Sequence, residues 1–205
     1  MDEMQQMWER RYAAGEQSPD GVAPHPEVLA LLERLEREPR AGTRTALDLG
    51  SGPGRHVLAL ARAGYDATGV DFSPTAVRVL EEALRRLGLP GRGVVGDLRT
   101  WSPREARQQG RADVPQEFDL VLAAYFQHSL QLLRDAAGWL APGGTLLWIT
   151  HAPDSADGPP AGVPRPGPAE TLRALEGTGL EVRRAEEVRT TGTALDVVLE
   201  AVRPR

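Results

Sequence analysis

Three glycines and two aspartates form the group of residues with the clearest chemical potential in this chain. Gly50, Gly52 and Gly54 lie within the stretch G-S-G-P-G, Asp48 stands two places before it, and Asp71 follows the next apolar stretch. Glycine accepts positive φ and lets a ligand approach the backbone closely. The helix that follows would offer unpaired N–H groups and a partial positive charge. This pattern predicts a site for a polar or anionic group of a nucleoside ligand.

The two carboxylates narrow the kind of nucleoside. Asp71 ends a predicted strand, where an acidic side chain can accept hydrogen bonds from both ribose hydroxyls. Asp48 would repel a pyrophosphate but could hold an ammonium group through water or backbone. Arg55 stands where the dinucleotide pattern G-x-G-x-x-G has its last glycine. The implied ligand is a nucleoside with a cationic amino-acid tail, and a nicotinamide dinucleotide is the alternative.

Alternating strands and helices must position these residues. The hydropathy pattern predicts an N-terminal helix, a helix from Pro26, and helices that begin near residues 54, 74, 129 and 169. Residues 98–117 read as irregular, and Pro142-Gly143-Gly144 as a turn before the fifth strand. The strands are expected at 45–49, 66–70, 94–95, 118–123, 145–150, 180–188 and 194–202.

The order of these elements predicts the fold class. Strands that alternate with helices favour a parallel sheet covered on both faces. The last two strands, joined by a turn at Gly192, are too close in sequence for a parallel crossover and must pair antiparallel. The prediction is an α/β, Rossmann-like three-layer sandwich. Its mainly parallel seven-stranded sheet has an antiparallel C-terminal hairpin strand.

Composition excludes several kinds of chemistry. The 205 residues contain no cysteine and no lysine, so thiolate nucleophiles, cysteine-ligated zinc and Schiff bases are ruled out. The net charge of −5 gives no reason to expect a nucleic-acid or membrane partner. The polar N-terminus lacks the apolar region of a secretory signal. A cytoplasmic protein with no metal, acting as a monomer or homodimer, is expected.

Several segments together resemble one family. D-L-G-S-G-P-G (48–54) resembles motif I of the class I S-adenosylmethionine-dependent methyltransferases. The resemblance covers about residues 26–203. The short segments W-E-R-R-Y (8–12) and D-L-R-T-W (97–101) resemble the branch with the tellurite-resistance and thiopurine methyltransferases. Further family segments match in the same order, namely G-V-D-F-S (69–73), G-D-L (96–98), F-D-L-V-L-A-A-Y (118–125) and L-A-P-G-G-T-L (140–146).

The resemblance implies S-adenosyl-L-methionine as cofactor and in-line methyl transfer to a small-molecule acceptor. It implies one methyltransferase domain over 1–205, with an N-terminal flap (1–25), a Rossmann-like core (26–203) and a Pro-rich loop (152–168). Asp97 would reach the adenine amino group, and Arg11 could meet the cofactor carboxylate. The expected cofactor-binding residues are Trp8, Arg11, Tyr12, Asp48, Gly50, Ser51, Gly52, Gly54, Asp71, Phe72, Asp97, Leu98, Ala123 and Ala124.

Three residues are candidates for catalysis. His128 and His151 follow predicted strands, where either could remove a proton from an acceptor. Tyr125 could place its ring against the sulfonium cation, or it could be a half-buried core residue. His25 is expected in solvent and His56 in packing. Two other functions stay open: a nicotinamide-dependent oxidoreductase, and a non-catalytic S-adenosylmethionine-binding protein.

Overall fold

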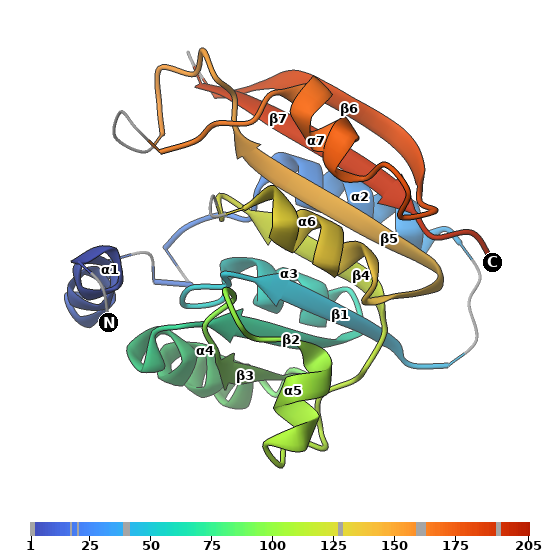
Figure 1. Cartoon of the computed structure of the whole chain (residues 1–205). Coiled ribbons are helices and arrows are strands. Elements are labelled where there is room, and N and C mark those ends of the chain that lie inside the picture. The colour runs from blue at the N-terminus through green and yellow to red at the C-terminus, as the bar shows by residue number, and fades with distance from the viewer. Residues whose placement is uncertain are drawn as a thin grey trace. The chain divides into compact units, whose positions relative to one another are not determined.

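The computed structural model describes residues 3–16, 18–19, 21–38, 42–126, 129–158, 163–191 and 194–205. The chain divides into two compact units, which are unit 1 (Met1–Gln116) and unit 2 (Glu117–Arg205). Each unit contains its own group of strands with helices packed on them (Figure 1).

Unit 1 has three parallel strands in the order β3-β2-β1, and α3 and α4 pack against them. In the register, Leu49 pairs with Val70 and Asp71 with Val95, so the strands end close together at one edge. The elements of unit 1 are α1 (Glu3–Ala13), α2 (Pro26–Glu36), β1 (Arg44–Leu49), α3 (Arg55–Arg62), β2 (Tyr65–Asp71), α4 (Pro74–Leu87), β3 (Gly91–Val95) and α5 (Pro103–Gln108).

Two helices of unit 1 begin with the same local signal. Ser73 caps α4 by accepting a hydrogen bond from the backbone N–H of Ala76, and proline follows at the first helical position. Ser102 caps α5 in the same way, accepting from Glu105. The expectation of an irregular 98–117 was therefore wrong, because a short helix forms within it from the same Ser-Pro start.

Unit 2 has four strands in the order β4-β5-β7-β6, of which β4 and β5 are parallel and the rest antiparallel. Helices α6 and α7 pack against each other, and Figure 1 shows them on one face of these strands. The predicted turn at Gly192 lies outside the described residues. The elements of unit 2 are β4 (Phe118–Ala124), α6 (Leu130–Ala137), β5 (Leu140–His151), α7 (Pro168–Ala174), β6 (Glu181–Thr191) and β7 (Ala194–Val202).

The stretch Pro142-Gly143-Gly144 belongs to a strand and not to a turn, so that prediction was wrong. It lies inside β5, where the pairing with β4 shifts so that the extra residues bulge out of the ladder. Backbone bonds hold the bulge, since Gly143 N–H donates to the Arg203 carbonyl (2.8 Å) and Arg203 N–H donates to the Gly144 carbonyl (2.9 Å).

The predicted fold class is confirmed. Together the two units supply seven strands, mainly parallel with an antiparallel hairpin at the C-terminal end, and helices flank them. The strands of a parallel sheet are covered on both faces and are therefore apolar along their length. Accordingly, Leu47, Leu49, Leu122 and Leu147 are at most 1% exposed. In such sheets ligands bind outside the carboxyl ends of the strands.

Candidate active site

The glycine turn connects β1 to α3 in unit 1. The backbone N–H groups of Gly50 and Ser51 both donate to the Val70 carbonyl, at 2.9 and 3.0 Å, which pins the turn to β2. Gly54 precedes α3 with φ at 99°, and a Cβ there would lie 2.4 Å from Leu80 Cδ1. Only glycine meets both conditions, and residues 51–54 of the turn are buried.

Asp71 joins the glycine turn to the loop after β2. Its carboxylate accepts hydrogen bonds from the N–H groups of Gly52 and Ser73, both at 2.9 Å, and the residue is 3% exposed. Burial raises the pKa of this carboxyl, and the two backbone bonds partly lower it again. Each carboxylate oxygen has a second lone pair. Asp71 can therefore also accept bonds from two ligand hydroxyls.

Asp48 is buried more completely and is less well satisfied. It is 1% exposed, and its Oδ2 has no hydrogen-bond partner among the described residues. Burial raises its pKa from 3.8 to about 8, although the positive charge of Arg55 works in the opposite direction. Leaving a buried acceptor without a partner is costly. The site therefore fits a ligand that brings a hydrogen-bond donor.

Helix α1 touches all three loops that follow the strands of unit 1. Gln5 Nε2 donates to Asp97 Oδ2 (3.4 Å) after β3. Glu9 accepts hydrogen bonds from the hydroxyls of Ser73 and Thr75 after β2. A Cβ on Gly52, in the turn after β1, would lie 3.2 Å from the Tyr12 hydroxyl. One face of α1 thus covers the edge where the carboxylates lie.

The other predicted residues of α1 pack on each other. Trp8 stacks on Tyr12 with ring centroids 5.5 Å apart, and the Arg11 guanidinium lies 4.5 Å from the Trp8 ring centre. Arg11 Nε also donates to Glu16 at 2.6 Å. Burial and the charge of Asp71 raise the pKa of Tyr12, which stays a neutral hydroxyl. The proposed role of Arg11 toward a cofactor carboxylate stays a prediction.

The loop after β3 carries Asp97 and Leu98. The Asp97 carboxylate accepts hydrogen bonds from Arg99, whose Nη2 lies 2.5 Å from Asp97 Oδ2. The hydrogen bonds from Arg99 lower the pKa of the Asp97 carboxyl. Leu98 is 8% exposed and the nearby Trp101 is equally buried. Phe72, after β2, is half-buried. The adenine contact proposed for Asp97 stays a prediction.

In unit 2 the predicted residues lie at the end of β4. Ala123 is fully buried and Ala124 is half-buried, and both are small enough to leave room beside them. Tyr125 follows with φ at 62°, which non-glycine residues rarely adopt. Such strain is kept only where other interactions hold it. Here the Tyr125 hydroxyl donates to Asp196 Oδ2 at 2.8 Å.

His151 and Asp196 form a pair, of which the sequence predicted only His151 as a candidate. His151 Nδ1 lies 3.2 Å from Asp196 Oδ1, and Thr190 Oγ1 donates to Asp196 Oδ2 at 2.6 Å. Asp196 is completely buried. Its only signal in the sequence was a carboxylate inside the apolar strand A-L-D-V-V-L (194–199). A buried charge in such a strand needs partners.

The remaining histidines divide into three cases. His128 lies outside the described residues. His56 is buried as expected, and burial lowers its pKa well below the usual range. The expectation that His25 is in solvent was wrong. It is 4% exposed because it caps α2, where its Nδ1 accepts a hydrogen bond from the backbone N–H of Glu27. The backbone N–H of His25 donates to His56 Nε2.

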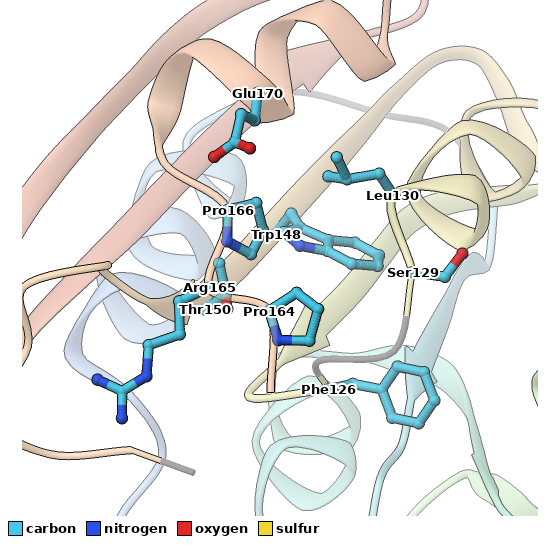
Figure 2. A pocket seen from close by; sticks show the side chains of 9 residues that line it. All are labelled: Phe126, Ser129, Leu130, Trp148, Thr150, Pro164, Arg165, Pro166 and Glu170. Atoms are coloured by element: carbon cyan, nitrogen blue, oxygen red, sulfur yellow. The ribbon is translucent and has the colours of Figure 1, made fainter. Parts of the chain in front are cut away.

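Unit 2 also contains a cavity of about 410 Å³ between α6, α7, β5 and the Pro-rich loop (Figure 2). Trp148 and Thr150 reach it from β5, and Arg165 and Glu170 bring the charged groups. Arg165 also donates to the Ser155 carbonyl at 2.9 Å, which braces the loop. The remaining lining residues are Phe126, Ser129, Leu130, Pro164 and Pro166.

Two features of the described residues concern membranes and metal ions. No helix in them is long and apolar enough to cross a membrane. In the same part of the chain, no three His, Asp or Glu side chains come together as a metal ion would require.

Comparisons with known proteins identify the chain as a methyltransferase. Residues 46–144 match the family model described as a methyltransferase domain. Ribosomal RNA small subunit methyltransferase G of Methylococcus capsulatus is 31% identical over 197 residues, covering 93% of this chain and 86% of that protein. Over shorter stretches the chain spans only 35–43% of the length of other curated methyltransferases that it matches.

Solved structures share the fold. The [4+2]-cyclase SpnF matches with a TM-score of 0.71 and 19% identity, over 98% of this chain and 95% of that chain. TehB from Haemophilus influenzae matches with a TM-score of 0.65 and 17% identity, over 95% and 67% of the two chains. At such identities the likeness concerns the fold alone, and a cyclase among the matches illustrates that one fold can host several reactions.

Proposed function

Because the chain belongs to the class I S-adenosylmethionine-dependent methyltransferases, we propose that it transfers a methyl group to a small-molecule acceptor. S-adenosyl-L-methionine is the cofactor of this family, and when bound it supplies a methyl group already activated by the sulfonium. The protein then needs to align the acceptor and exclude water, which can supply roughly 7–11 kcal/mol. Neither cysteine nor lysine is needed for such a reaction, and the chain has neither.

We assign cofactor binding to unit 1. Asp71 would accept hydrogen bonds from the ribose hydroxyls, and Asp48 would face the ammonium group of the methionine part. The observation that supports this assignment is the buried Asp48 Oδ2, which has no partner among the described residues. Tyr12 would close over the glycine turn, since its hydroxyl already approaches Gly52.

The cavity of unit 2 carries the proposal of a small-molecule acceptor. Its volume of about 410 Å³ falls in the range of small-molecule sites, roughly 300–1,000 Å³. Apolar side chains dominate its lining, with two charged groups among them. A relative named for ribosomal RNA makes RNA the competing acceptor. RNA binding calls for a basic surface, and the net charge of −5 supports the small molecule instead.

The test is transfer of labelled methyl from S-adenosyl-L-methionine to two sets of acceptors. One set contains small phenols, thiols and amines, and the other contains ribosomal RNA and small ribosomal subunits. The proposal expects label in at least one small molecule and none in RNA. Label in RNA alone would overturn the small-molecule acceptor. Gly52→Val serves as the control for label that does not depend on the cofactor site.

The same proposal includes one methyltransferase domain over the whole chain, acting in the cytoplasm as a monomer or homodimer. Light scattering of the purified protein, together with the location of a tagged chain in cells, checks these two points. A larger assembly or a membrane-bound chain would contradict them.

A further inference from the structure

The polar network around Asp196 in unit 2 suggests more than a structural role. Asp196 is completely buried, and it pairs across the strands with His151. The hydroxyls of Tyr125 and Thr190 donate to its Oδ2, at 2.8 and 2.6 Å. Its other oxygen, Oδ1, lies 3.2 Å from His151 Nδ1. Residues from all four strands or strand ends of the unit therefore converge on this one carboxylate.

The imidazole of His151 is held on more than one side. Its ring stacks on that of Tyr125, with centroids 4.5 Å apart and planes at 30°. A Cβ on Gly158 would lie 3.0 Å from its Cδ2, so the loop passes directly over the ring. The side chain is 20% exposed although Nδ1 is buried, so the exposed atoms lie elsewhere in the side chain.

The position of Nδ1 decides where the proton lies in the neutral ring. Nδ1 is buried and forms no well-aligned hydrogen bond with any described residue, and its close neighbour is the carboxylate oxygen of Asp196. A lone pair on Nδ1 would be repelled by the negatively charged oxygen of Asp196. A proton on Nδ1 would instead be attracted by that oxygen, which is a hydrogen-bond acceptor. The second nitrogen of the neutral ring, Nε2, must then carry the lone pair.

We propose that Asp196 is a positioning residue that keeps the proton of neutral His151 on Nδ1, so that Nε2 accepts the proton of a hydroxyl acceptor. This inference rests on the proposed methyl transfer and specifies its acceptor class. Methylation of a soft thiolate needs no base, so a built base indicates an acceptor that must lose a proton. Asp196 would also stabilise the imidazolium that forms, as in other His–Asp pairs.

The proton and electron balance of the step is simple. The acceptor oxygen forms a bond to the methyl carbon, and the carbon–sulfur bond breaks with its electron pair passing to sulfur. The hydroxyl proton passes to His151 Nε2, and the imidazolium later releases it to solvent. No oxidant, reductant or metal enters the balance.

The surroundings of His151 favour a phenol over an amine. Arg165 lines the cavity, and its guanidinium carbon lies 3.2 Å from the same Gly158 Cβ position that the His151 ring approaches. A cation beside the base opposes binding of a cationic amine and favours a developing phenolate. The acceptor class is therefore a hydroxyl compound.

The most direct test locates the proton. Nitrogen-15 NMR of the histidine-labelled full chain, with His151→Gln to assign the signal, reports the tautomer of the neutral ring. We expect the Nδ1–H form for His151, and loss of this preference in Asp196→Asn, whose amide can donate to Nδ1. Asp154→Asn makes the same chemical change at an exposed site and should leave the signal unchanged. An Nε2–H tautomer in the unaltered protein overturns the proposal, even where Asp196→Asn fails to fold.

Activity tests the acceptor class separately. With a phenol acceptor, Asp196→Asn should lower kcat by about 10²-fold, the lower end of what proton transfer contributes. With thiophenol the loss should stay below about threefold, because no base is needed there. Equal losses with both acceptors, or methyl transfer to amines alone, overturn the hydroxyl class. Absence of any methyl transfer overturns the proposed function as well, whereas the NMR result still decides the role of Asp196.

Discussion

Units 1 and 2 each bury a carboxylate near a strand end, but they satisfy it in different ways. Asp71 in unit 1 accepts from two backbone N–H groups, those of Gly52 and Ser73. Asp196 in unit 2 accepts from two side-chain hydroxyls, those of Tyr125 and Thr190. Backbone donors require a particular path of the chain, while hydroxyl donors can come from any strand within reach.

This difference explains why one region has a sequence signature and the other has none. The path of the chain around Asp71 needs glycine, and glycine at fixed spacing is visible in the sequence. The donors to Asp196 come from segments far apart in the chain, so no spacing marks them. If this contrast is correct, changes that disturb the backbone should have the largest effects in unit 1. In unit 2, removing one hydroxyl donor should have a small effect on stability, and the effects of two such removals should not be additive.

The largest effect is expected at Gly52. A side chain there would meet the Tyr12 hydroxyl at 3.2 Å, in a backbone with φ at 52°. Gly52→Val should weaken S-adenosylmethionine binding by at least about 100-fold, measured by calorimetry. Gly88→Val is the matched control, because its φ is 62° but a Cβ there meets nothing within 4 Å. It should lose stability and keep its affinity. Equal affinity in Gly52→Val and the parent would refute the site.

The next largest effect is expected at Asp71. Asp71→Ala removes two charge-assisted hydrogen bonds to ribose, so the dissociation constant should rise roughly 10- to 100-fold. Asp66 lies at the other end of the same strand and is bonded to Arg92. Asp66→Ala should therefore change stability and leave affinity alone. An unchanged dissociation constant in Asp71→Ala would show that Asp71 serves only to accept the backbone hydrogen bonds from Gly52 and Ser73.

Asp48 should make stability depend on pH. Its pKa rises from 3.8 to about 8 on folding, so the folded state holds the proton more tightly. The contribution of Asp48 to stability should therefore be largest below about pH 4 and be lost as pH rises towards about 8, by about 1.4 kcal/mol per unit of pKa difference at most. Urea unfolding of Asp48→Asn should lack this slope, and Asp154→Asn should keep it. Parallel curves for Asp48→Asn and the parent would contradict the assignment.

The smallest effects belong to unit 2. Tyr125→Phe and Thr190→Val each remove one hydroxyl donor to Asp196 Oδ2 and should each cost about 1 kcal/mol of unfolding free energy. Because they share one acceptor oxygen, the double variant should deviate from additivity by at least about 0.5 kcal/mol. Strict additivity in a denaturant double-mutant cycle would show that the two donors act independently, and would contradict the contrast drawn with Asp71.

The sequence was most informative where the backbone itself imposes the residue type. The glycine turn, the serine-proline start of α4 and the strand ending at Asp71 were all predicted and confirmed as structure. The start of α5 carried the same Ser-Pro signal at Ser102, but the polar residues around it obscured a helix of six residues. Local chemistry therefore predicted most of the fold, with errors in short elements.

Features that depend on tertiary packing could not be predicted. His25 appeared exposed between two prolines, and its burial comes from its contact with His56, 31 residues away. The glycines of the β5 bulge resembled a turn, because their bonds to Arg203 come from the far end of the chain. Asp196 gave a single hint, a charge in an apolar strand. Its partners are set by strand pairing, which no local pattern reveals.

The glycine turn with Asp48 and Asp71 is our proposed binding site for S-adenosylmethionine. Calorimetric titration of the purified protein with S-adenosylmethionine, S-adenosylhomocysteine and NAD, in parallel and in two buffers near pH 6.5, tests it most directly. We expect micromolar binding of both adenosyl sulfur compounds and none of NAD. We also expect release of close to one proton, because the pKa of Asp48 should fall from about 8 when the carboxyl faces the ammonium group. Binding of NAD alone, or of none of the three, would contradict it.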